Sequence, residues 1–164
     1  MFDLDRFRSA QARSVDGFNT ALAELKAGRK RSHWIWYIFP QLAGLGSSAM
    51  AVRYGLRGVA EAMDYLRDAT LRGRLLILTN TLVTQLQGRP APALRELMGS
   101  EIDALKLVSS MTLFGEVARR LGQVEPLADY ETLAANADAI LIIASQQGFE
   151  ECAATRGELA SATR

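Results

Sequence analysis

Apolar residues recur at intervals of three or four along most of the chain, which is the spacing of one face of a helix. The pattern predicts helices over about residues 4–11, 16–27, 49–54, 57–66, 69–86, 93–98, 101–121 and 129–147. The sequence offers no set of strands that could pair with one another. We therefore expect an all-α protein, built as a single compact multi-helix domain over residues 1–164.

Residues that begin and end helices stand where this pattern needs them. A serine, threonine or aspartate can cap a helix by accepting a bond from a backbone N–H of the first turn. Such residues precede three of the predicted helices: Ser47 or Ser48, then Asp68 or Thr70, then Ser100. Asp103 follows Ser100 by three positions, which resembles a capping box with Asp in place of Glu or Gln. Gly28, Gly55 and Gly122 are natural helix ends.

Two segments interrupt the helical pattern. Residues 88–92 hold two of the four prolines, and we interpret them as a loop within one domain because the residues beyond them are poor in aromatic side chains. After Gly148 the composition becomes small and polar, which predicts disorder from about residue 155. The apolar stripe of residues 133–144 suits either a core or the contact of a homodimer.

The stretch from Gly28 to Gln41 contains the widest variety of functional side chains in the chain. It is followed by a glycine-rich turn at residues 44–48. The stretch contains the only histidine, both tryptophans and a basic run at residues 29–31. Residues 32–40 show neither helical nor strand periodicity, and we expect a short helix or an irregular buried segment there.

This stretch has the composition of an anion site. Lys30 and its neighbouring arginines supply positive charge, and Ser32 can cap a short helix or donate to an anion. A helix start beside basic side chains suits a phosphate group, because free N–H groups and the helix dipole favour negative charge. Trp34 and Trp36 can stack on a planar base.

A second polar group lies on an otherwise apolar helix. Lys106, Ser109 and Ser110 share one helical face and can converge on one point. Burying such hydroxyls without partners costs about 1–3 kcal/mol each. We predict that the two stretches meet across a pocket that binds a phosphorylated, nucleotide-like small molecule, with Lys30 and Lys106 holding its anion.

His33 is the leading candidate for a catalytic acid or base, since its ordinary pKa lies near neutrality. Glu61 and Asp129 rank behind it. Hydrolysis or glycosidic cleavage is the chemistry we would look for, but the sequence identifies no reaction and no cofactor.

The same motifs resemble those of the DUF1810 family. The resemblance is carried by GRK at 28–30, SHWIWYIFPQ at 32–41, GLGSS at 44–48 and KLVSSMTLF at 106–114. It runs from about residue 4 to residue 133 and leaves residues 134–164 outside. The resemblance implies an all-α, Rv1873-like fold of small bacterial proteins, with no established activity and no established ligand.

Each candidate residue also has an ordinary structural role. Aromatic side chains dominate cores, which accounts for Trp34 and Trp36 without a ligand. Lys30 suits a solvated face, and His33 suits a hydrogen-bonded core position. Small residues such as Ser109 and Ser110 allow close helix packing, and Cys152 lies outside the motifs, so we interpret it as structural.

Two hypotheses of function follow, and they differ in geometry. A ligand site requires Lys30, His33, Trp34 and Lys106 to approach one another around a hollow. The alternative is a non-enzymatic helical module for structure or protein interaction. It requires both tryptophans to be fully packed and the two lysines to lie far apart.

Composition narrows the remaining classes. A formal net charge of +1 argues against a broad nucleic-acid surface, which is usually strongly basic. One cysteine forms no intrachain disulfide, one histidine forms no three-histidine metal centre, and the acids show no ligand spacing, so we predict no metal site. The N-terminus begins with acids rather than a secretory signal, and no run is long enough to span a membrane, so we expect a cytoplasmic protein.

Overall fold

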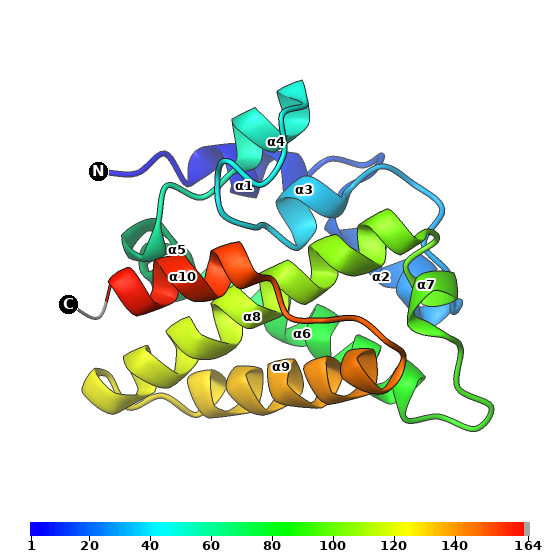
Figure 1. Ribbon diagram of the computed structural model, residues 1–164. Coiled ribbons are helices and arrows are strands. Elements are labelled where there is room, and N and C mark those ends of the chain that lie inside the picture. The colour runs from blue at the N-terminus through cyan, green and yellow to red at the C-terminus, as the bar shows by residue number, and fades with distance from the viewer. Residues whose placement is uncertain (163–164) are drawn as a thin grey trace.

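The chain folds around one long helix, α8 (Glu101–Val124), which runs diagonally through the molecule (Figure 1). The computed structural model describes residues 1–162, and over that range it contains ten helices. The prediction of an all-α protein is confirmed. The other helices are α1 (Asp5–Gln11), α2 (Phe18–Lys26), α3 (Ile35–Ile38), α4 (Ala49–Tyr54), α5 (Val59–Arg67), α6 (Ala69–Leu86), α7 (Leu94–Leu97), α9 (Ala128–Gln146) and α10 (Ala153–Ser161).

Helix α8 is covered on every side of its middle part. It packs against α9 along most of its length and also contacts α3, α5, α7 and α10. Every residue from Leu107 to Gly115 is buried, so no polar face remains over more than two turns. Close packing is possible because some of these residues are small. A Cβ atom added to Gly115 would lie only 2.9 Å from the Cβ of Ala137 on α9.

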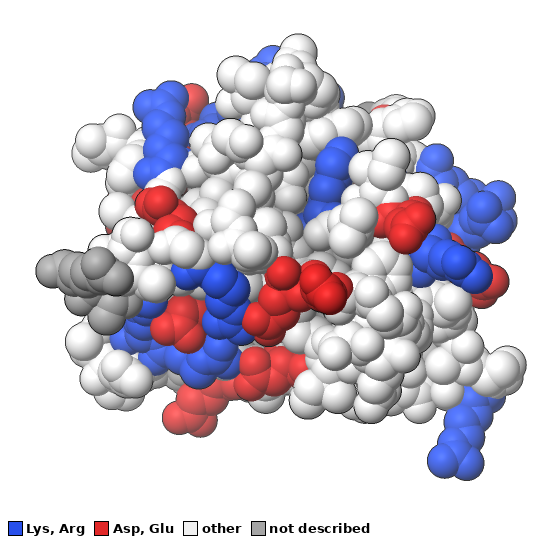
Figure 2. Space-filling view, viewed as in Figure 1, with Lys and Arg blue, Asp and Glu red and all other residues white. Residues whose placement is uncertain are grey.

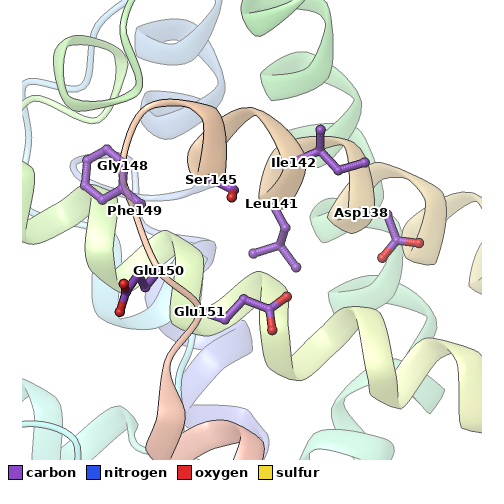
Figure 3. Close-up of a pocket in the computed structure, with 8 residues that line it drawn as sticks. All are labelled: Asp138, Leu141, Ile142, Ser145, Gly148, Phe149, Glu150 and Glu151. Carbon is purple, nitrogen blue, oxygen red and sulfur yellow. The ribbon is translucent and has the colours of Figure 1, made fainter.

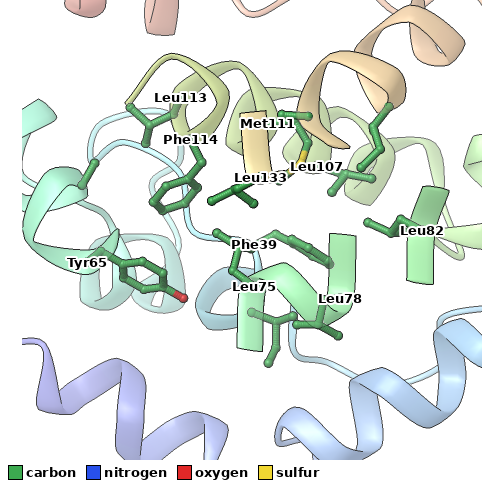
Figure 4. Packing of buried hydrophobic residues seen from close by; sticks show 14 of the residues in the cluster. Phe39, Tyr65, Leu75, Leu78, Leu82, Leu107, Met111, Leu113, Phe114 and Leu133 are labelled. Atoms are coloured by element: carbon green, nitrogen blue, oxygen red, sulfur yellow. The ribbon is translucent and has the colours of Figure 1, made fainter. Parts of the chain in front are cut away.

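The hydrophobic core forms where α8 meets α5, α6, α9 and the segment after α3 (Figure 4). Phe39, Tyr65, Leu75, Phe114 and Leu133 converge there and are each at most 1 % exposed. The rings of Tyr65 and Phe114 are tilted by 42° to each other, with 5.1 Å between their centroids. Part of the aromatic run after Ser32 therefore belongs to the hydrophobic core.

Three of the predicted helix caps are formed. Ser48 Oγ accepts from Ala51 N at 3.1 Å, Asp68 Oδ1 from Leu71 N at 2.9 Å, and Ser100 Oγ from Asp103 N at 3.1 Å. Each bond satisfies an N–H group that has no partner inside its own helix. These contacts are local, which is why the sequence predicts them well.

The loop before α4 is closed by a pair of backbone hydrogen bonds. Ala43 N donates to Leu56 O at 2.8 Å, and Leu56 N donates to Gln41 O at 3.0 Å. Gly55 permits this contact, because a Cβ atom there would lie 2.7 Å from the Cα of Ala43. The two ends of residues 43–55 are thereby fixed to each other, and the turn of residues 44–48 lies between them.

The prediction of disorder from about residue 155 is wrong for the residues that the structure describes. Residues 153–161 form α10, which crosses in front of α8 (Figure 1). Thr155 and Leu159 are buried, and Ser109 of α8 contacts Thr155 with 3.2 Å between the two hydroxyl oxygens. The helix is weakly apolar, and its place depends on a fit to α8 that composition does not reveal. Residues 163–164 lie outside the described range.

The apolar stripe of α9 is used inside the chain. Leu133, Ala137, Ile140 and Ala144 are buried, and Leu141 is half-buried. Because α9 packs on α8 and α6, the stripe is accounted for by the core of one chain. Within residues 1–162, no helix combines the length and the hydropathy required to cross a membrane.

Replacing Leu159 by Ala should lower the free energy of unfolding by about 2–5 kcal/mol, because a buried leucine loses its contacts and leaves a cavity. Chemical denaturation of the two proteins measures the change. Leu127→Ala is the control, since that leucine is 40 % exposed and should cost much less. Equal losses in the two variants would show that α10 does not stabilise the fold.

Candidate functional site

The segment that joins α2 to α3 is organised by the carboxylate of Glu24, near the end of α2. Glu24 Oε1 accepts from Arg31 N at 2.7 Å, Ser32 N at 2.8 Å and Trp34 Nε1 at 3.0 Å. Glu24 Oε2 accepts from the hydroxyl of Ser32 at 2.6 Å. The donors expected to bind a phosphate thus bind an anion that belongs to the chain itself.

These bonds change the acidity of Glu24. Partial burial raises the pKa of its carboxyl group, but the hydrogen bonds from Ser32, Arg31 and Trp34 outweigh that effect and lower the pKa below the ordinary value of 4.5. The charged form is therefore the one that holds the segment in place.

Lys30 is buried rather than solvated. Its side chain is only 7 % exposed, its ammonium lies 2.8 Å from Asp103 Oδ2, and it also donates to the backbone oxygen of Ser32. The same ammonium lies 4.9 Å from the centroid of the Trp34 ring. Trp34 itself is fully buried.

Asp103 brings the two predicted stretches together. Its second oxygen, Oδ1, lies 3.9 Å from the ammonium of Lys106, one turn further along α8. The Lys106 ammonium lies 4.8 Å from the centroid of the Trp36 ring, which is half-buried. The two lysines therefore share one carboxylate. The sequence predicted only a helix-capping role for Asp103. Its pairing with Lys30 could not be predicted, because the two residues lie far apart in the sequence.

The hydroxyls of α8 are mostly used within the fold. Ser109 is buried against Thr155, and Thr112 Oγ1 donates to Val108 O at 2.8 Å. Ser110 is fully buried, and its hydroxyl has no hydrogen-bond partner in the part of the chain that the structure describes. Lys106 and Ser109 lie toward one hollow, described next, whereas Ser110 does not line it.

A hollow of about 640 Å³, which we call the α4–α8 groove, lies beside Lys106. This volume is in the range of small-molecule sites. Its walls come from the turn before α4, from the first half of α8 and from the segment before α10. The lining residues are Gln41, Leu45, Gly46, Ser47, Ser48, Ala51, Ile102, Leu105, Lys106, Val108, Ser109, Glu150, Glu151 and Cys152.

Two features of the groove are not evident from the sequence. Ile102 and Leu105 stand at the spacing of an apolar helix face, yet they are 66 % and 49 % exposed, because the buried face of α8 is centred on Ala104 and Leu107. Cys152 is half-buried at the start of α10. Burial raises the pKa of its thiol, but the nearby groups of Thr155 and Ser109 lower it overall. The segment that supplies Cys152 lies outside the motifs, so no sequence signal pointed to it.

His33 is exposed and does not line the groove. Its backbone oxygen accepts from the Tyr37 hydroxyl at 3.2 Å. Two carboxylates considered with it are paired with arginines: Glu61 Oε1 lies 2.6 Å from Arg6, and Asp129 Oδ2 lies 2.9 Å from Arg72. Both are thus engaged in contacts between helices.

Acidic and basic side chains both occur on this face, and their arrangement differs from one region to another (Figure 2). Acidic side chains gather over the segment that joins α9 to α10, and a basic side chain stands above them between uncharged surfaces. At the C-terminal half of α8 the two signs are mixed, with Arg119 2.8 Å from Asp138 and Arg120 3.0 Å from Glu116. No cluster of three or more potential metal ligands occurs among residues 1–162.

A second hollow, of about 680 Å³, lies between α9 and the segment of residues 148–151 (Figure 3). Leu141 points toward that segment, and Asp138 and Glu151 stand at its edge. These two carboxylates are paired with Arg119 and Arg156. We favour the α4–α8 groove as the candidate site, because it contains an incompletely paired cation and residues from three of the motifs.

Comparison with known proteins agrees with this architecture. The profile of the family described as "Protein of unknown function (DUF1810)" matches residues 1–133. The chain belongs to the DUF1810 family. It is also similar to the crystal structure of the conserved hypothetical protein Rv1873 from Mycobacterium tuberculosis, with 40 % identity, a TM-score of 0.76 and coverage of 97 % of each chain. No curated protein matches.

The DUF1810 profile and the Rv1873 match differ in extent. The profile ends within α9, at residue 133, whereas the match to Rv1873 covers nearly the whole chain. The segment around Cys152 that closes the groove therefore lies beyond the profile, but the similarity to the Rv1873 structure covers 97 % of the chain.

Glu24→Gln should lower the free energy of unfolding at pH 7 by about 1–3 kcal/mol, because four donors lose a charged acceptor. The folded-state pKa of Glu24 is lowered, so its contribution is present above pH 4.5 and is lost as the pH falls through the folded-state value. Denaturation measured at several pH values should therefore show the difference between wild type and variant shrinking in acid. Glu131→Gln, at an exposed position, is the control. A difference that stays constant from neutral to acid pH would contradict this role.

Proposed function

We propose that this DUF1810 protein binds a small phosphorylated, nucleotide-like molecule in the α4–α8 groove, with Lys106 as the contact for its anionic group. The single observation that carries the proposal is the state of Lys106. Its only carboxylate neighbour, among the ion pairs of residues 1–162, is Asp103 at 3.9 Å, and Asp103 is held more closely by Lys30. One carboxylate shared by two ammonium groups leaves an excess positive charge on the Lys106 wall of the groove, whereas Glu150 and Glu151 make another wall acidic.

The roles of the predicted ligand residues divide accordingly. Lys106 and Ser109 line the groove and are proposed to contact the ligand directly. Lys30 is proposed to act through Asp103, which it holds away from Lys106. Ser32 and Trp34 fix the segment that carries Lys30 and are bound by Glu24.

The groove also suits the rest of such a ligand. Ile102 and Leu105 offer exposed apolar surface for a planar base, and Ser47 and Ser48 offer hydroxyls. Glu150 and Glu151 on the opposite wall can accept from sugar hydroxyls. A ligand with an anion at one end and hydroxyls at the other matches this distribution. Catalysis by His33 remains a prediction, and the groove offers no support for it.

Exposed Ile102 and Leu105 also favour a second candidate function. Apolar side chains at the rim of a groove are typical of protein-interaction surfaces. In that case the groove holds a segment of a partner protein, and the chain acts as a non-enzymatic module. The screen below distinguishes the two functions.

A thermal-shift screen against AMP, ADP-ribose, NAD, ribose 5-phosphate and inorganic phosphate should find at least one ligand that raises the melting temperature. A ligand present at 100 times its dissociation constant adds about 2.7 kcal/mol of stability. Lys106→Ala should weaken binding at least tenfold, because it removes a charged contact worth about 1.5–3 kcal/mol.

Lys26→Ala is the matched control, since Lys26 is an exposed lysine on α2, outside the groove. If the ligand raises the melting temperature of Lys106→Ala as much as that of the wild type, the ligand binds outside the groove. If no compound in the screen raises the melting temperature, the ligand proposal fails, and a pull-down for protein partners becomes the next experiment.

A further inference from the structure

The indole N–H of Trp36 is unlike that of Trp34. Trp34 Nε1 donates to Glu24 at 3.0 Å, whereas Trp36 Nε1 is buried and has no hydrogen-bond acceptor among the described residues. Buried donors in folded proteins are nearly always paired, because leaving one unpaired is costly. Trp36 therefore has an unused donor close to the candidate site.

Trp36 lines a small recess beside the groove. The recess is also lined by Gln41, Gly46 and Ala51, and these three residues line the α4–α8 groove as well. Its volume is about 10 Å³. A space of this size accepts one oxygen atom, such as that of a water molecule, but not a sugar or a base.

The positive charge of the site lies over the same aromatic ring. Lys106 Nζ is 4.8 Å from the centroid of the Trp36 ring. The unpaired indole donor belongs to the recess, the ammonium group of Lys106 belongs to the adjoining groove, and the two meet at the Trp36 ring. A phosphate group carries several oxygens on one centre, so it can offer one oxygen to the recess and another to Lys106.

We propose that Trp36 recognises the bound anion directly: one oxygen of the ligand enters the recess and accepts from Trp36 Nε1, while Lys106 pairs with the charge. This inference rests on the proposed function and makes it more specific. The ligand is then an oxyanion, most suitably a phosphate ester. One of its oxygens occupies the recess.

The two tryptophans provide an internal comparison. In a ¹H–¹⁵N correlation spectrum of the full chain, each indole gives one signal, and the Trp36→Phe variant identifies which belongs to Trp36. Titration with AMP, ribose 5-phosphate or inorganic phosphate should move the Trp36 indole signal and leave the Trp34 signal in place. Trp36→Phe should weaken binding of the same probe about tenfold, since it removes one donor to a charged group.

Gly46→Ala gives a second test that keeps the indole. The added Cβ atom would lie 2.9 Å from the Cβ of Ala51, so the recess becomes narrower. Binding should weaken, and the Trp36 signal should respond less to the probe. Gly73→Ala is the matched control, because a Cβ atom there meets nothing within 4 Å.

The outcomes separate this inference from the function on which it rests. If a probe moves the backbone amide signals around Lys106 but not the Trp36 indole, the inference is overturned and the proposed function stands. Undiminished affinity in Trp36→Phe overturns it in the same way and assigns the recess to water. If none of the probes moves any signal, both proposals are overturned.

Discussion

The burial of the middle of α8, residues 107–115, on all sides is the constraint on which the rest of the structure depends. A helix segment with no solvated face must pair or eliminate its polar groups, and this part of α8 does so with small side chains, except for the Ser110 hydroxyl, which has no partner among the described residues. Thr112 bonds to its own backbone, Ser109 bonds to Thr155, and Gly115 allows α9 to approach. The serine-rich motif is thus explained mainly by packing. Only at its N-terminal end, where the cover is incomplete, does α8 present Lys106 to a groove.

Asp103 connects this central helix to the aromatic motif. Its two oxygens contact Lys30 and Lys106, and those lysines lie over Trp34 and Trp36 respectively. The two halves of this arrangement differ in exposure. Lys30 and Trp34 are buried and hold the fold together, whereas Lys106 and Trp36 are half-buried beside the groove. One carboxylate therefore joins a structural contact to a candidate binding contact.

Sequence reasoning succeeded where the determining contacts are local. Ser48, Asp68 and Ser100 cap helices a few residues away, and the long motifs identified the DUF1810 family. It failed where the contacts are distant. The pairing of Lys30 with Asp103, the capture of Ser32 by Glu24 and the docking of Thr155 on Ser109 all depend on the arrangement of helices in space. The groove was missed in part for the same reason, since Cys152 approaches Ser109 only after α9 and α10 have packed.

The way Glu24 is bound has a consequence for ionic strength. Its carboxylate is stabilised by hydrogen bonds from backbone N–H groups, a hydroxyl and an indole, all of which are uncharged donors. Added salt screens attraction between exposed ions over a Debye length of about 10 Å at 0.1 M, but it weakens short hydrogen bonds from uncharged, partly buried donors less. Exposed ion pairs, such as that of Arg67 with Glu125, are weakened first at high salt concentration. The segment between α2 and α3 is thus held by contacts that added salt affects less than it affects exposed ion pairs.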